Sequence, residues 1–302
     1  MNKSNDESPK ISTFFARKLS NDLSAPPAHV EKQSVTSLAS ESASSTASSQ
    51  AHSPSLRGLC GRNRFNECVS LFDASGISLR PWLENGYDCY AYDLVNVDEV
   101  RDGIHYRHAD LDDADTMRRI VEFHRGDAYF VSAYPPCTDM ALSGSRWWAA
   151  KRAANDLFQH LAAARAIKVA RAAEAMSCIY YIENPVGALC SLWRKCDFSF
   201  HPYEYGGYLP IGDVHPTHPD RVPARDAYPK RTCIWASKTF RKPPRKPVAV
   251  VFRLFKNAKT GKLNRYAPQH AISRGGQSKC AQIRSLTPRG FSKAVFLANK
   301  IN

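Results

Sequence analysis

The chain has 302 residues, of which 43% are hydrophobic and 11% aromatic, and it carries a net charge of +14. No apolar stretch approaches the roughly 20 residues that span a bilayer, which excludes a membrane-spanning protein. Nine cysteines are spread thinly and form no CxxC pair, which favours reduced thiols in a soluble intracellular protein over a disulfide-stapled secreted one.

Residues 1–57 are predicted to be a disordered, Ser-rich N-terminal arm, since nine of the 21 residues from 34 to 54 are Ser. Its polar start, with Asp6 and Glu7, predicts neither a secretory signal nor a transit peptide. Ile11, Phe14 and Phe15 have a spacing that resembles peptides that dock on sliding clamps. A sticky disordered arm is the interpretation that we favour for them.

From residue 58 onward, strand and helix patterns alternate. The expected strands cover 68–72, 88–93, 105–108, 127–133 and 179–182, the last stopped by Asn184 and Pro185, and the expected helices cover 77–85, 113–124 and 157–176. This alternation predicts an α/β fold with a doubly wound, mostly parallel, Rossmann-like sheet in a domain spanning 58–185.

Residues 186–280 are predicted to form a small, loop-rich basic region. It contains expected strands at 232–235 and 248–252 and a hairpin around Gly261. A final helix is expected over 287–300, with Thr287 as its N-cap, in a segment 281–302 that returns to the first domain. Residues 221–302 hold 20 Lys or Arg against one acid, Asp226. This charge favours contact with nucleic-acid phosphates, and a solvated basic surface is the alternative.

Polar residues stand at the ends of several expected strands, where ligands bind in an open parallel sheet. Gly76, in the turn after the first strand, lets the backbone approach a cofactor closely. Asp93 ends the second strand and can accept hydrogen bonds from a ribose diol. Asp110 follows the third and can bond an adenine amino group. Each signal is weak alone, and for Asp93 a surface Asp capping a loop is an equal alternative.

Cys137 follows Pro135 and Pro136 at the end of the fourth strand, where a rigid backbone would hold a thiol exposed for nucleophilic attack. A buried Cys beside a structural turn is the alternative. Glu183 ends the fifth strand, so we expect the two side chains to converge. A thiol and a carboxylic group together suit attack on C6 of a cytosine ring, because the carboxylic group relieves the charge that develops at N3.

The Pro-Pro-Cys at 135–137 and the Glu-Asn-Pro at 183–185 resemble the two catalytic motifs of DNA cytosine-C5 methyltransferases. The usual second motif is Glu-Asn-Val, and the form with Pro185 resembles compact enzymes of phages and prophages. Segments 71–93, 136–147, 226–233 and 284–288 are similar to the same family. The resemblance extends over about residues 68–298.

This resemblance implies an S-adenosylmethionine-dependent enzyme that flips a cytosine out of double-stranded DNA. It implies Cys137 as nucleophile, Glu183 as cytosine-binding acid, a cofactor site at Phe72, Ser75, Gly76, Asp93, Asp110 and Pro135, and DNA contacts from Ser143, Arg146, Trp147 and Lys230. The chain departs from the family at Ala74, where Gly is usual, and in lacking the Gln-x-Arg-x-Arg motif. Arg231 is our candidate for the arginine of that motif.

Two other functions stay open: an RNA cytosine-C5 methyltransferase, and a catalytically silent relative that binds DNA. The phage-like resemblance favours a monomer in the cytoplasm of a bacterial or phage-infected host that evades restriction, with a nuclear location as the alternative. The Cys and His residues after 189 match no structural zinc spacing, so no metal is predicted. These residues are Cys190, Cys196, His201, His215, His218 and Cys233.

Overall fold

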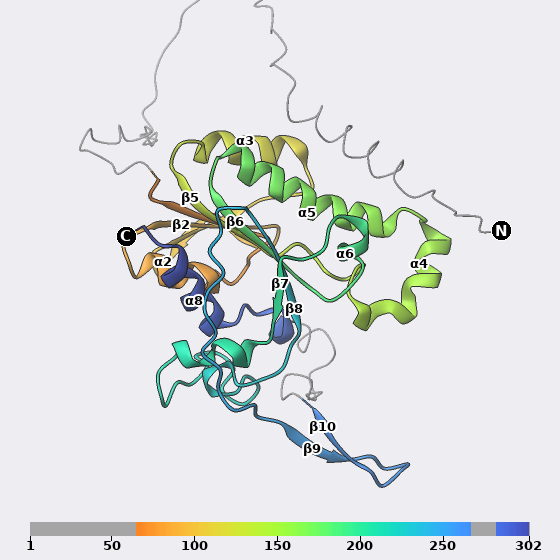
Figure 1. Cartoon of the computed structure of the whole chain (residues 1–302). Helices are drawn as coiled ribbons and strands as arrows, with labels where there is room; N and C mark the ends of the chain where they lie inside the picture. Colours follow the sequence, from red (N-terminus) through yellow and green to blue (C-terminus); the bar gives the residue numbers. More distant parts are fainter. Residues whose placement is uncertain (1–64, 267–281, 302) are drawn as a thin grey trace, which may run out of the picture.

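The computed structural model describes residues 65–266 and 282–301, in which an eight-stranded sheet lies between two layers of helices (Figure 1). The sheet strands are β1 (Glu67–Leu71), β2 (Asp88–Asp93), β3 (Glu99–Arg101), β4 (Ile104–His108), β5 (Ala128–Ala133), β6 (Ile179–Pro185), β7 (Phe198–Phe200) and β8 (Thr232–Ala236). The main helices are α2 (Arg80–Leu83), α3 (Ala114–His124), α4 (Trp148–Ala154), α5 (Phe158–Ala175), α6 (Leu189–Leu192) and α8 (Arg289–Asn299). The predicted α/β architecture is confirmed.

The strand order is β3-β4-β2-β1-β5-β6-β8-β7. Pairings between β4, β2, β1, β5 and β6 are parallel, whereas β3, β8 and β7 run antiparallel to the strands beside them. The chain therefore builds outward from β1 through β2 and β4, then crosses back to β5 and β6 on the other side. This reversal makes the carboxyl ends of β1 and β5 the topological switch point, where open α/β sheets bind ligands.

Each face of the sheet has its own apolar core because successive residues of a strand point to opposite sides. Val69 and Leu71 belong to the core beneath α3 and α5, whereas Cys68 belongs to the core beneath α2 and α8. Alanines line the buried side of α5, namely Ala162, Ala163, Ala166, Ala170 and Ala173. Their small size lets the helix backbone lie close to the strands.

The helix α8 packs against the second face through aromatic side chains. The ring of Phe291 stacks on Phe200 at 4.0 Å between centroids, and Phe296 meets Trp82 edge-on at 5.1 Å. The C-terminal segment thus packs on the same sheet as the residues that follow β1. Thr287 was predicted as the N-cap of this helix, but that prediction is wrong. Pro288 holds the N-cap position, and Thr287 is buried before it.

Several expected elements have different bounds in the structure. Residues 77–85 form a 3-10 turn, η1 (Ile77–Leu79), followed by the short α2 rather than one helix. The strand β6 continues through Pro185 because β8 pairs with it on the far side, with Pro185 opposite Thr232. Residues 248–252 form no strand, and the next strand begins at Arg253. The helix α4, the strand β3 and the strand β7 were not predicted.

Beyond the sheet, the chain forms 3-10 turns and a projecting hairpin (Figure 1). The turns are η2 (Leu142–Trp147), η3 (Pro202–Tyr208) and η4 (Ala224–Asp226), and the hairpin pairs β9 (Arg253–Lys256) with β10 (Leu263–Tyr266). Gly261 at the hairpin tip has a φ of +66°. The predicted N-terminal arm, with Ile11, Phe14 and Phe15, lies outside the described residues. In the described ranges no helix is both long and apolar enough to cross a membrane.

Candidate active site

The ends of five parallel strands meet at one edge of the sheet, and backbone hydrogen bonds tie them together. The N–H of Tyr134 donates to the carbonyl of Leu71 at 3.0 Å, which joins the ends of β5 and β1. The N–H of Asp73 donates to Tyr92 at 3.2 Å, and the N–H of Ala109 donates to Asp93 at 3.1 Å. The residues predicted at separate strand ends therefore form one continuous row.

The turn after β1 is held by the buried carboxylate of Asp73. Its Oδ1 accepts hydrogen bonds from the N–H groups of Ser75 and Gly76, both at 2.8 Å, and from the hydroxyl of Ser75 at 2.7 Å. Gly76 has a φ of +64°, and a Cβ there would lie 2.5 Å from the hydroxyl of Tyr106. The turn holds the predicted cofactor residues Phe72, Ser75 and Gly76. Sequence reasoning did not assign Asp73, although Asp two residues before Ser is a typical side-chain-capped turn.

Asp93 and Asp110, the two acids predicted to bind the cofactor, lie farther along the same edge. Asp93 is half-buried, and burial raises the pKa of its carboxyl, while the N–H of Val95, which donates to Oδ1 at 3.1 Å, opposes the rise. Asp110 is exposed, and its Oδ1 accepts the N–H of Asp112 at 2.9 Å. Both carboxylates keep one oxygen that is not used in these bonds, so each retains capacity to accept a further donor.

Asn184 joins the motif on β6 to the turn that carries Cys137. Its Nδ2 donates to the carbonyl of Pro135 at 2.9 Å, and its side chain is buried. Pro135 is buried, Pro136 is exposed, and Cys137 is intermediate between them. The thiol is therefore partly buried, on a backbone that is fixed from a neighbouring strand.

The structure brings Cys137 and Glu183 close enough for their charges to interact. Burial raises the pKa of the Cys137 thiol, the negative charge of Glu183 adds to the rise, and the charges of Lys230 and Arg284 oppose it. Oε1 of Glu183 is buried and has no hydrogen-bond partner among the described residues. Its nearest cation is Nζ of Lys230, at 4.0 Å. A buried carboxylate oxygen without a donor is costly, so this site is suited to receive a donor from a ligand.

Lys230, predicted as a DNA contact, is the basic side chain that lies beside Glu183. Arg231 is exposed, and its charge acts on His201 and Cys233 rather than on Cys137. Arg284, which sequence reasoning did not assign to the site, contributes to the electrostatics of the thiol. Its segment was recognised only as similar to the family. The signal that could have found it is a basic residue just before a helix that packs back onto the sheet.

The segment after Cys137 is clamped to the segment after β6. The N–H of Leu142 donates to Val186 at 3.1 Å, and the N–H of Ala188 donates to Met140 at 2.9 Å. A Cβ on Gly187 would lie 1.9 Å from the carbonyl oxygen of Met140, so only glycine fits this crossing. Beyond the clamp, η2 and α4 contain no buried residue.

The predicted DNA-contacting residues of this segment lie on η2. Ser143, Arg146 and Trp147 are all exposed, with Trp147 at 58%. The guanidinium of Arg146 lies over the Trp147 ring at 5.1 Å from its centroid. These side chains therefore face solvent next to Cys137 in sequence, as a surface that contacts a large substrate requires.

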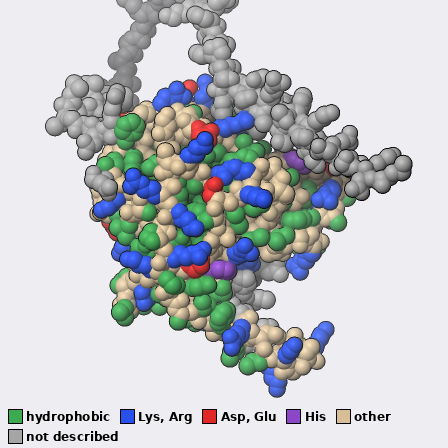
Figure 2. Space-filling model, in the orientation of Figure 1, with side chains coloured by type: hydrophobic (Ala, Val, Ile, Leu, Met, Phe, Trp, Pro, Cys, Tyr) green, Lys and Arg blue, Asp and Glu red, His purple; other side chains and the backbone are tan. Residues whose placement is uncertain are grey.

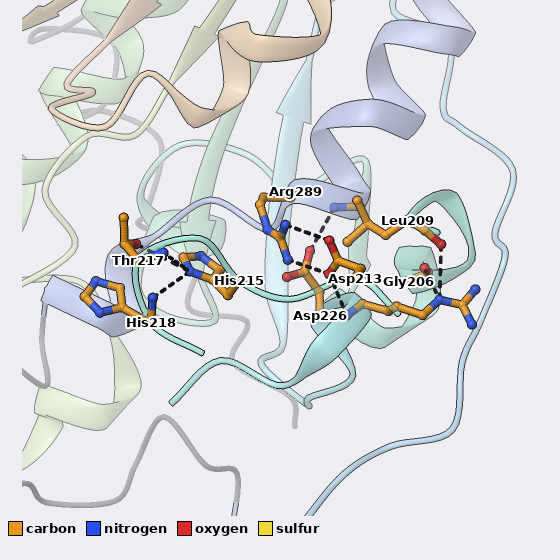
Figure 3. A network of polar contacts seen from close by, with 10 residues as sticks. Gly206, Leu209, Asp213, His215, Thr217, His218, Asp226 and Arg289 are labelled. Atoms are coloured by element: carbon orange, nitrogen blue, oxygen red, sulfur yellow. Dashed lines mark hydrogen bonds and ion pairs between the residues drawn. The ribbon is translucent and has the colours of Figure 1, made fainter. Parts of the chain in front are cut away.

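A polar network ties the start of α8 to the loop-rich region (Figure 3). Arg289 donates to both carboxylate oxygens of Asp213, at 2.8 and 2.6 Å, and the N–H of Gly290 donates to Asp226 at 2.8 Å. Burial raises the pKa of Asp226 to about 6. Burial also lowers the pKa of His215 to about 4, so this ring stays neutral at physiological pH. The network fixes the segment that carries Arg284 against residues 206–226.

No group of three or more His, Cys, Asp or Glu side chains in the described ranges is arranged to hold a metal ion. The chain matches no protein-family model, and a comparison with curated proteins finds no significant match. The functional assignment therefore rests on the geometry of the site.

Proposed function

We propose that the protein is an S-adenosylmethionine-dependent DNA cytosine-C5 methyltransferase. The observation that carries the proposal is the pairing of a partly exposed thiol, Cys137, with the unpartnered buried oxygen of Glu183 at the ends of adjacent parallel strands. A nucleophile and a carboxylic group in this relation suit attack on a ring whose developing charge must be relieved by a hydrogen bond.

In the proposed reaction, the Cys137 thiolate forms a bond to C6 of a flipped cytosine. Glu183 shares a proton with N3 and accepts a hydrogen bond from the exocyclic amine, which withdraws electron density from C6 and favours addition of the thiolate there. The addition moves the electron pair of the C5–C6 double bond to C5, which becomes nucleophilic. C5 would take the methyl group as the methyl–sulfur bond of the sulfonium breaks and leaves a neutral thioether. A base then removes the C5 proton, and the Cys137–C6 bond breaks as the C5–C6 double bond forms again and the thiolate is released. Lys230 supplies positive charge beside both groups, and this charge favours the thiolate over the thiol.

The turn 72–76, Asp93, Asp110 and Pro135 would hold S-adenosylmethionine, whose sulfonium supplies the methyl group. These residues fit the cofactor because they lie at the switch point of the sheet and offer carboxylate acceptors for a ribose and an amino group. The adjacent Cys137 turn would place the reacting base within reach of the same edge.

Positive charge supports DNA as the substrate. From 253 to 265 the hairpin carries five basic residues and no acid, namely Arg253, Lys256, Lys259, Lys262 and Arg265. Figure 2 shows Lys and Arg side chains over much of one face and on the projecting hairpin. Phosphate neutralisation by such residues gives affinity that falls steeply with salt.

The decisive experiment is covalent trapping. Purified protein is incubated with labelled S-adenosylmethionine and duplex DNA that contains 5-fluorocytosine, whose fluorine blocks the final elimination. We expect a cofactor-dependent protein–DNA adduct that is lost in Cys137→Ser and kept in Cys178→Ser, a matched thiol change at another partly buried position. An adduct with RNA alone moves the substrate to RNA. No adduct with either, from folded protein, favours the silent DNA-binding function.

A further inference from the structure

The carboxylate of Asp73 is the most completely hydrogen-bonded acid at the candidate active site. In addition to the three donors on Oδ1, its Oδ2 accepts the hydroxyls of Ser70 at 2.8 Å and Ser78 at 3.1 Å. Ser132 on β5 bonds both of these serines, at 3.0 and 3.1 Å. Asp73 is 4% exposed and the three serines are no more exposed than that. No ion pair to Asp73 occurs among the described residues, so neutral donors alone stabilise its charge.

In this arrangement, the backbone N–H groups that could bind a phosphate already donate to Asp73. Nucleotide cofactors bind at strand-to-helix turns because free backbone N–H groups point at their phosphates. Here the N–H groups of Ser75 and Gly76 both point at Asp73, at 2.8 Å. The carboxylate would also bring its negative charge close to a phosphate bound at this turn, and two negative charges in close contact repel.

We propose that Asp73, with Ser70, Ser78 and Ser132, is a positioning unit that shapes the turn 73–76 for a cofactor without phosphate and excludes nucleotides that carry one. This proposal rests on the proposed function, because it concerns the cofactor of that site. The serines come from β1, η1 and β5, so one carboxylate fixes the relative positions of three elements at the switch point.

The test measures cofactor binding by calorimetry, independently of methyl transfer. Wild type, Asp73→Ala, Asp73→Asn and a surface control, Ser191→Ala, are each titrated with S-adenosylhomocysteine and with ADP. Wild type and the control are expected to bind S-adenosylhomocysteine at least about 100-fold more tightly than ADP. Asp73→Ala is expected to lose roughly tenfold or more in S-adenosylhomocysteine affinity, because the turn loses its shared acceptor.

The variant Asp73→Asn separates shape from charge. Asn keeps an acceptor for the turn, so S-adenosylhomocysteine should still bind, whereas removal of the charge should narrow the preference over ADP by roughly tenfold. A merely structural role for Asp73 predicts an unchanged preference in this variant. If Asp73→Ala does not fold by thermal melting, the double variant Ser78→Ala and Ser132→Ala replaces it, with the same loss expected.

The outcomes separate this proposal from the proposed function. Wild-type affinity for S-adenosylhomocysteine in Asp73→Ala, or an unchanged preference in Asp73→Asn, overturns the positioning unit alone, because covalent trapping through Cys137 tests the chemistry separately. Tight binding of ADP by wild type also overturns it. If wild type binds no S-adenosylhomocysteine, both the positioning unit and the assigned cofactor are overturned.

Discussion

Two carboxylates at the same edge of the sheet, the buried Asp73 and the partly buried Glu183, differ in their hydrogen bonding. Asp73, in the turn after β1, accepts five hydrogen bonds from its own turn and from neighbouring serines. Oε1 of Glu183, at the end of β6, is buried and has no hydrogen-bond partner in the described ranges. Nζ of Lys230 lies 4.0 Å from this oxygen. Both oxygens of Asp73 accept hydrogen bonds from groups of the protein, whereas Oε1 of Glu183 can still accept a hydrogen bond from a ligand.

We expect this difference to distinguish an acid that holds the fold together from an acid that binds a ligand. A saturated carboxylate resists change because moving it breaks several bonds at once, so it defines a rigid surface. An unsaturated buried oxygen costs free energy in the unliganded protein, and that cost is recovered only when a ligand supplies the missing hydrogen. Asp226 lies between the two, since the backbone N–H of Gly290 donates to its buried side chain.

The largest expected effect is on Glu183. Substitution Glu183→Gln keeps the shape but alters the hydrogen-bonding and charge that relieve the ring, so we expect methyl transfer to fall by roughly 10²- to 10³-fold. Single-turnover assays with labelled S-adenosylmethionine and unmethylated DNA measure this rate. Glu174→Gln, a surface change at the end of α5, is the matched control and should keep its rate. A near-normal rate in Glu183→Gln removes the proposed role.

The carboxyl group of Asp226 allows a test of how the stability of the fold depends on pH. Because the pKa of Asp226 is raised to about 6 in the folded state, the folded protein binds the extra proton and loses stability as pH rises from about 4 to about 6. The loss should reach about 3 kcal/mol. The variant Asp226→Asn should lack this slope in urea unfolding measured at each pH. A difference between the two proteins that does not vary with pH contradicts the assigned burial cost.

The clamp between the segment after Cys137 and the segment after β6 gives a smaller expected effect. The substitution Gly187→Ala places a methyl group against the carbonyl of Met140, so the segments must move apart, at a cost of about 1–3 kcal/mol. Thermal melting should show the destabilisation, and methyl transfer should fall because Cys137 shifts relative to Glu183. Gly144→Ala, at a position without a positive φ where a Cβ would meet only the carbonyl oxygen of Thr138, at 3.4 Å, is the control for steric contact in thermal melting. Equal loss in both variants would falsify the clamp.

The smallest effect concerns the reactivity of the Cys137 thiol in the absence of DNA. Its raised pKa predicts slow alkylation by iodoacetamide at neutral pH and a rise only at higher pH. Glu183→Gln removes the negative charge that raises the pKa of the thiol, so it should speed alkylation a few-fold at pH 7, whereas Lys230→Met should slow alkylation. Both effects are small because charges at a partly solvated site interact weakly. Intact-mass measurement over a pH series gives the rates. Arg231→Met should leave them unchanged, and an effect as large as that of Lys230→Met restores Arg231 to the site.

Local patterns in the sequence were enough to predict the parallel strands β1, β2, β4, β5 and β6 and the row of their carboxyl ends. The strand at 88–93 and the Asp113-capped helix α3 follow from short-range periodicity and capping, which depend on neighbours along the chain. The same patterns missed the extension of β6 through Pro185, because that extension depends on pairing with β8, more than 40 residues away. Because a proline has no N–H to donate to a neighbouring strand, Pro185 predicts the end of the strand as long as its pairing with β8 is unknown.

The sequence by itself determined the kinds of residue at the candidate active site, and only the tertiary structure decided which of them act together. Lys230 and Arg231 are neighbours just before β8, and only the fold places Lys230 rather than Arg231 beside Glu183. The hydroxyl of Ser70 on β1 donates to Asp73 and is itself bonded by Ser132 on β5, which is 62 residues away along the chain. Such contacts depend on register and burial, which are set by packing across the sheet rather than by the order of residues along the chain.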